Sequence, residues 1–190
     1  MRYVTLKALI LGMLLLVVGA PVSVGHAVPI TETLPTVVRL IPGNIRMDVG
    51  QTVHVEMWVE NVSALYGADV QLSFDPQAFQ VVDANPSLAG VQVSLRYDLL
   101  TPGFLLHREA DNTLGRIWYA NSMVNPAEPA YGSGALFEFE LTAIKNGIYP
   151  IIFGNVQLVA YGAEPIAAEV RNASYTVGYA LFFPLILREI

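Results

Sequence analysis

Leu65-Tyr-Gly-Ala-Asp-Val-Gln-Leu-Ser-Phe-Asp-Pro-Gln-Ala-Phe-Gln-Val-Val-Asp83 is the stretch of sequence that decides the fold. From Val70 to Phe74 it alternates apolar and polar residues, which is the period-two pattern of a strand with one buried face. Asp75-Pro76 then favours a tight turn, and a second apolar run follows at Phe79-Gln-Val-Val82. The stretch therefore indicates a half-buried strand, an acidic turn and a further extended segment.

The same alternation recurs on both sides of this stretch, from Val53 to Val59 and from Phe137 to Leu141. Turn-forming pairs such as Asn85-Pro86, Asn125-Pro126 and Asn146-Gly147 separate the apolar runs. After residue 27, no stretch keeps a helical period over three turns. We therefore expect an all-β fold, an antiparallel β-sandwich of eight or nine strands with jelly-roll topology.

The first 27 residues have the features of a secretory signal peptide. Arg2 and Lys7 precede an uncharged run, and small residues lie three and one positions before a cut after Ala27. The alternative is an uncleaved anchor, because Ala8–Gly25 approaches the roughly 18 to 20 apolar residues of a spanning helix. We expect a secreted or cell-surface protein that meets a membrane only through this segment or its C-terminal tail.

The remaining boundaries follow from composition. Residues 28–35 are expected to form a mobile lead-in, residues 36–177 one sandwich domain, and residues 178–190 an apolar tail. The tail is too short to span a bilayer, and Pro184 interrupts it. Two interpretations stay open for the tail, namely a sorting or surface-docking segment, or a last strand or strap packed on the domain.

Charge and cysteine content narrow the class of partner. Removing Arg2 and Lys7 with the signal peptide leaves eight of the ten basic residues against sixteen acidic ones. Such a surface repels a phosphate backbone, so we expect no nucleic-acid partner. The sequence has no cysteine, which excludes disulfides and thiolate metal sites and leaves stability to the core.

No motif for catalysis stands out. Neither His54 nor His107 has a metal-ligand spacing. Glu138 and Glu140 resemble a glycosidase pair only by spacing, because every alternating strand puts residues i and i+2 on one face. We expect no enzyme activity, no cofactor and no resident metal. A calcium loop of the Asp-x-Asp-x-Asp kind is also missing, so any calcium would belong to a partner.

In order and spacing, three segments resemble the cohesins, the extracellular modules that grip dockerin domains in cellulosome-type assemblies. Asp75-Pro76 followed by Phe79–Val82 resembles the end of the third cohesin strand. Gly115–Ser122 resembles the sixth strand and Gly134–Ile144 resembles the eighth. The resemblance spans residues 36 to 177 and implies a jelly-roll sandwich in a non-catalytic module linked to extracellular polysaccharide degradation.

The resemblance also implies that a flat sheet face docks a dockerin-bearing protein, which carries its own calcium. Asp69 matches a position where type I cohesins often have an aspartate that accepts hydrogen bonds from the partner, and Trp118 matches a partner-facing apolar position. Gly67 departs from the pattern, because type I sequences often have a polar contact residue there. With apolar residues turned inward, the expected partner-binding set is Gly67, Asp69, Gln71, Ser73, His107, Arg116, Trp118, Ala120, Glu138 and Glu140.

Two alternatives come from other functional classes. A carbohydrate-binding module of related sandwich fold would place aromatic rings in a row to stack on a polysaccharide, and the candidates are Trp58, Tyr97, Trp118 and Tyr131. A structural protein of the cell envelope is the other alternative, for which the C-terminal tail is the argument.

Overall fold

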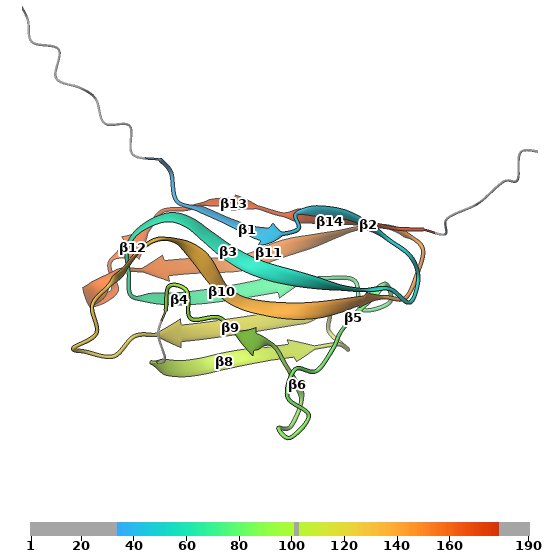
Figure 1. The fold of residues 1–190 in the computed structure, drawn as a ribbon, viewed down its shortest axis with the longest axis horizontal. Coiled ribbons are helices and arrows are strands. Elements are labelled where there is room, and N and C mark those ends of the chain that lie inside the picture. Colours follow the sequence, from blue (N-terminus) through green and yellow to red (C-terminus); the bar gives the residue numbers. More distant parts are fainter. Residues whose placement is uncertain (1–33, 101–102, 179–190) are drawn as a thin grey trace, which may run out of the picture. The chain divides into compact units, whose positions relative to one another are not determined.

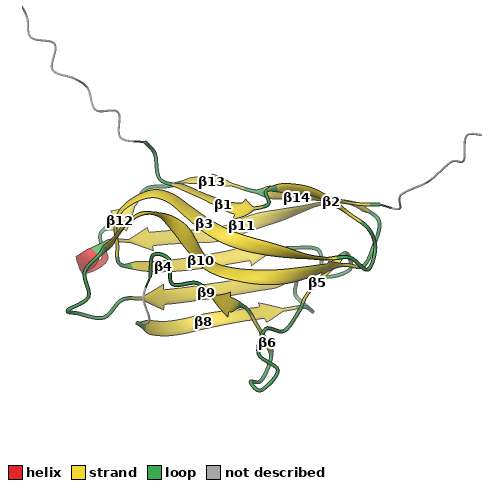
Figure 2. Cartoon of the chain, viewed as in Figure 1, coloured by secondary structure: helices red, strands yellow, loops and turns green. Residues whose placement is uncertain are grey.

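The computed structural model describes residues 34–100 and 103–178. Within these ranges the chain forms fourteen strands and one short 3-10 turn, Tyr161–Ala163 (Figures 1 and 2). Nine of the strands have four residues or more, and the expected all-β sandwich is confirmed. The proposed signal peptide, the lead-in up to residue 33 and the tail from residue 179 lie outside the described residues.

The first sheet contains the long central pair β3 and β10, which are antiparallel and run along most of the domain. Its strands, in spatial order, are β13 (Glu169–Arg171), β1 (Val37–Ile41), β3 (Thr52–Leu65), β10 (Ala130–Ala143) and β5 (Phe79–Val81), with β7 (Ser94–Leu95) also paired to β10.

The second sheet is the larger one, and it holds the strand quoted at the start of the sequence analysis. Its order is β2 (Asn44–Met47), β14 (Ala173–Val177), β11 (Gly147–Val159), β4 (Gly67–Ser73), β9 (Arg116–Ser122), β8 (Phe104–Asp111) and β6 (Val91–Gln92), with β12 (Pro165–Ile166) paired to β11.

Most pairings in the described strands are antiparallel, as expected. Two are parallel: β1 with β13, where Val37 faces Glu169, and β2 with β14, where Asn44 faces Ser174. Both join the beginning of the domain to its end.

The core fills the space between the two sheets. Alternation along β3 and β10 turns Met57 and Phe137 fully inward, and alternation along β4 and β9 does the same for Leu72 and Tyr119. The rings of Tyr119 and Phe137 stack across the core with centroids 5.0 Å apart, and burial raises the pKa of Tyr119 to about 12. Because apolar residues face inward, the polar members of each strand lie on the two outer faces. Among the described residues, no helix is long and apolar enough to cross a bilayer.

Candidate docking face

The expected partner-binding residues of β4 and β9 meet on one outer face. The two strands pair directly, with Asp69 opposite Ala120, Gln71 opposite Trp118 and Ser73 opposite Arg116. The residues between them on each strand are buried in the core. We call the outer side of β11, β4, β9 and β8 the front face.

His107 joins this face from β8, on the other side of β9. It lies opposite Ala120, and Glu109 lies opposite Trp118. A bulge at Leu106 shifts the register between Leu105 and His107. That extra residue breaks the alternation of the segment, and it turns His107 toward Trp118.

Glu138 and Glu140 are not on the front face, and the expectation that they share it with Asp69 is wrong. They lie on β10, which pairs with β3 in the other sheet. Phe137 and Phe139 of that strand point into the core, so the two glutamates point out on the opposite side of the sandwich. Alternation gives the outward residues of a strand, but it does not say which sheet the strand joins.

The strand that flanks β4 is β11, which brings two residues that the sequence analysis did not name. Asn155 lies opposite Gln71 and Gln157 lies opposite Asp69. A register shift between Phe153 and Asn155 interrupts the alternation of β11, so its outward residues could not be counted from the sequence. The turn pair Asn146-Gly147, whose glycine is the first residue of β11, was the available signal that a strand begins there.

Trp118 lies at the centre of the front face and is held on several sides. Its Nε1 donates a hydrogen bond to Asp69 Oδ1 at 3.0 Å. The ring of His107 stacks on the indole at a centroid distance of 3.5 Å and an interplanar angle of 12°. The guanidinium carbon of Arg116 lies 5.6 Å from the indole centroid, within the range of a cation–π contact. The indole is therefore held in place by contacts within the sheet itself.

The two oxygens of Asp69 differ in their surroundings. Oδ1 is used by Trp118, whereas Oδ2 accepts no hydrogen bond from any described residue. His107 is oriented in turn by Glu109, with Nδ1 3.2 Å from Glu109 Oε1. The centre of the face thus presents one open carboxylate oxygen on a rigid support of stacked rings.

The front face is more apolar where β4 begins and where β9 and β11 end. A shallow groove there is lined by the neighbouring residues Gly67, Leu106, Ala120, Gln157 and Val159. Ala120 is only 5% exposed, whereas Leu106 is 56% and Phe104 63% exposed. A side chain at position 67 would crowd this groove, because an added Cβ would lie 3.1 Å from Val159 Cγ2. The glycine that departs from the type I pattern therefore leaves room for Val159 of β11.

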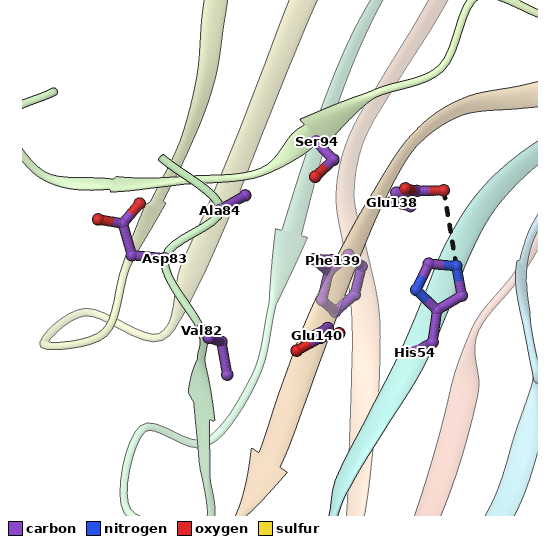
Figure 3. A pocket seen from close by; sticks show the side chains of 8 residues that line it. All are labelled: His54, Val82, Asp83, Ala84, Ser94, Glu138, Phe139 and Glu140. Carbon is purple, nitrogen blue, oxygen red and sulfur yellow. Dashed lines mark ion pairs between the residues drawn. The ribbon is translucent and has the colours of Figure 1, made fainter. Parts of the chain in front are cut away.

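The opposite outer face, which we call the back face, carries a separate polar cluster (Figure 3). His54 Nε2 lies 3.5 Å from Glu138 Oε2, and both residues line a hollow with Ser94 and Glu140. Donor atoms of His54, Glu56 and Glu138 lie within 4.8 Å of one another, a spacing that suits a metal ion.

An arginine already occupies the anionic side of this cluster. Arg96 Nη1 donates to Glu56 Oε1 at 3.0 Å and to Glu138 Oε2 at 2.8 Å. These contacts raise the pKa of Arg96, chiefly through the hydrogen bond to Glu138, and the guanidinium lies between the two carboxylates and offsets one of their two negative charges. The cluster joins residues far apart in the sequence, and no local spacing could have predicted it.

The aromatic residues considered for sugar stacking do not form one strip. Trp58 lies on the back face, where its Nε1 donates to Glu56 Oε2 at 2.8 Å, and Trp118 lies on the front face. Tyr97 and Tyr131 are more than half exposed. A flat row that uses both tryptophans is therefore ruled out.

Comparisons with known proteins agree with this architecture. The family model of the cohesin domain matches residues 39–177. A type II cohesin from the cellulosome of Acetivibrio cellulolyticus is 15% identical over 75% of this chain and 95% of its own, with a TM-score of 0.62. The novel type I cohesin–dockerin complex Coh-OlpA-Doc918 from Clostridium thermocellum contains a match of 14% identity over 76% of this chain and 99% of that chain, with a TM-score of 0.61.

A non-cellulosomal cohesin from the archaeon Archaeoglobus fulgidus is 14% identical over 77% of this chain and 93% of its own, with a TM-score of 0.58. No curated protein sequence matched the chain. The structural matches, at these identities, establish a shared fold, and the family model covers most of the chain. The chain therefore belongs to the cohesin domain family.

Proposed function

We propose that this chain is a non-catalytic docking module whose front face binds a dockerin-bearing partner. The observation that carries the proposal is the hydrogen bond from Trp118 to Asp69 at the centre of a sheet surface formed by four adjacent strands. Similar solved structures that contain a cohesin bound to a dockerin support it.

The front face offers two kinds of contact to such a partner. The open Oδ2 of Asp69 accepts a hydrogen bond from a partner donor, and the groove beside Gly67 and Leu106 takes an apolar side chain. Tryptophan is enriched among the residues that dominate binding energy at interfaces. We expect a one-to-one complex that buries about 1,200–2,000 Å² in total, with any calcium carried by the partner.

The proposal excludes catalysis at the glutamate pair. Glu138 accepts a hydrogen bond from Arg96 and lies beside His54. Its carboxylate is therefore part of the ion-pair cluster on the back face. We also propose secretion or display at the cell surface, supported by the sequence of residues 1–27, and a role in extracellular polysaccharide degradation, supported by the cellulosomal origin of similar structures.

The test is capture of dockerin-bearing proteins by residues 28–190, with and without calcium. We expect calcium-dependent, one-to-one capture that Asp69→Ala abolishes, because the substitution removes both the open oxygen and the acceptor that orients Trp118. Glu140→Ala is the matched control, since it removes an exposed carboxylate from the opposite face.

Equal loss in both variants, with both domains folded, would contradict the front-face assignment. A folded domain that captures no dockerin, but whose tryptophan fluorescence is quenched by oligosaccharides, would replace the proposal with carbohydrate binding. Failure with both kinds of ligand would favour a structural role in the cell envelope.

A further inference from the structure

An apolar stripe runs along the outer side of β11, at the end of the strand away from the candidate docking groove. Ile148, Pro150 and Ile152 alternate with inward residues, so their side chains share this outer side. Ile148 is 71% exposed and Ile152 is 44% exposed. Neighbouring hydroxyl side chains border the stripe, namely Thr176 opposite Ile148, Ser174 opposite Pro150 and Ser73 opposite Ile152.

The chain leaves the described sandwich beside this stripe. Val177, the last residue of β14, lies opposite Gly147, which directly precedes Ile148. Gly178 donates its N–H to the carbonyl oxygen of Met47 at 3.0 Å, and no atom of residues 34–100 or 103–176 lies within 4 Å of where its Cβ would be. A glycine in open space at this point allows the chain to reverse direction.

The sequence that follows is long enough to cover the stripe, and it is apolar like the stripe. Residues 179–190 read Tyr-Ala-Leu-Phe-Phe-Pro-Leu-Ile-Leu-Arg-Glu-Ile, with six large aliphatic or phenyl side chains from Leu181 to Leu187. The stripe from Ile148 to Ile152 is about 14 Å long, and twelve extended residues reach about 40 Å. A turn after Gly178 therefore leaves enough chain to cover it.

We infer that residues 179–190 fold back across the outer side of β11 as a strap and cover the stripe. Pro184 cannot donate a hydrogen bond in the middle of a sheet, but a segment that lies across a face by side-chain packing needs no such bond. The tether gives the strap an effective concentration in the millimolar range, well above that of a second molecule. The inference does not depend on the proposed docking function.

The absence of cysteine makes the strap measurable by thiol protection. Ile152→Cys places one thiol in the stripe, and its modification rate is compared between chains 28–190 and 28–178. We expect modification to be slower by about tenfold in the longer chain, which corresponds to a strap seated about nine-tenths of the time. Leu114→Cys is the control, because Leu114 is also exposed but lies in the turn between β8 and β9, away from the stripe, and its rate stays the same in both chains.

A second pair of proteins separates packing from folding. Leu185→Asn together with Leu187→Asn keeps the length of the chain, removes apolar side chains from the tail and restores fast modification at position 152. Equal rates in the long and short chains overturn the inference. Protection that rises with protein concentration, or that requires added phosphatidylcholine–phosphatidylglycerol vesicles, also overturns it in favour of a second copy or a membrane surface.

Discussion

The two outer faces of the sandwich each hold a tryptophan whose indole N–H is bonded to a carboxylate, yet their surroundings differ. On the back face, Trp58 donates a hydrogen bond to Glu56, which also accepts one from Arg96. Arg96 donates a further hydrogen bond to Glu138. On the front face, the carboxylate of Asp69 accepts from Trp118 alone among the described residues. The proposed docking face therefore differs from the back face less in its residue types than in the hydrogen-bonding capacity that its carboxylate leaves open.

The largest effect is expected from a substitution in the core, which supports both outer faces. Phe137→Ala empties a fully buried site that stacks on Tyr119, and we expect the free energy of unfolding to fall by about 3–5 kcal/mol. Denaturant unfolding followed by tryptophan fluorescence measures this loss. If partner affinity fell while stability stayed unchanged, the shared core would not be what positions the two faces.

The comparison between the faces is sharpest in the tryptophan pair. Trp118→Ala should weaken partner binding by at least about 2 kcal/mol, or roughly thirtyfold in Kd, because the indole orients Asp69 and fills the centre of the front face. Trp58→Ala should change the affinity by less than about twofold. Calorimetric titration of both variants with one dockerin-bearing partner gives the two numbers, and similar losses would end the distinction between the faces.

The charge of Asp69 can be separated from its role in holding Trp118. Asp69→Asn keeps an oxygen that accepts from the indole but leaves no anionic oxygen for the partner. We expect a smaller loss of affinity than in Asp69→Ala. Because the negative charge is gone, the association rate should depend less on salt than it does in the wild type. Stopped-flow association at two ionic strengths measures both effects, and an equal loss of affinity in the two variants would show that only the anionic oxygen matters and that the orientation of Trp118 does not.

Glycines on the front face offer a smaller, steric test. Gly67→Ala should cost about 1 kcal/mol in stability and narrow the groove, since its Cβ meets Val159 at 3.1 Å. Gly154→Ala is the matched control on β11, where the nearest atom lies at 3.8 Å. Thermal unfolding compares the two, and an equal change in Tm would mean that β11 yields freely to a side chain at position 67.

The smallest effect is expected on the back face. Arg96→Gln removes the cation that joins Glu56 and Glu138, so Tm should fall slightly, and less so at high salt. Partner binding should not change, because the front face is untouched. A marked loss of binding in this variant would show that the two faces are coupled through the sandwich.

Much of the front face could be predicted from the sequence because β4 and β9 alternate without interruption. Counting outward residues from Asp75-Pro76 placed Asp69 correctly beside the strand of Trp118. The same counting placed Glu138 on an outward surface but gave the wrong sheet, since strand pairing depends on contacts between distant segments. Asn155 and Gln157 were missed because the irregularity in β11 hides their direction.

The two parallel pairings at the ends of the domain have a consequence for how the chain folds. Val37 pairs with Glu169 and Asn44 pairs with Ser174. Strands β1 and β2, near the start of the domain, therefore cannot form these pairings until β13 and β14, near its end, have been synthesised. Contacts so distant in sequence make folding slow, in the range of milliseconds to seconds for β-sandwiches. A ribosome-bound chain that has not yet exposed β13 and β14 cannot complete either sheet, so folding of this domain is completed only after β14 has left the ribosome.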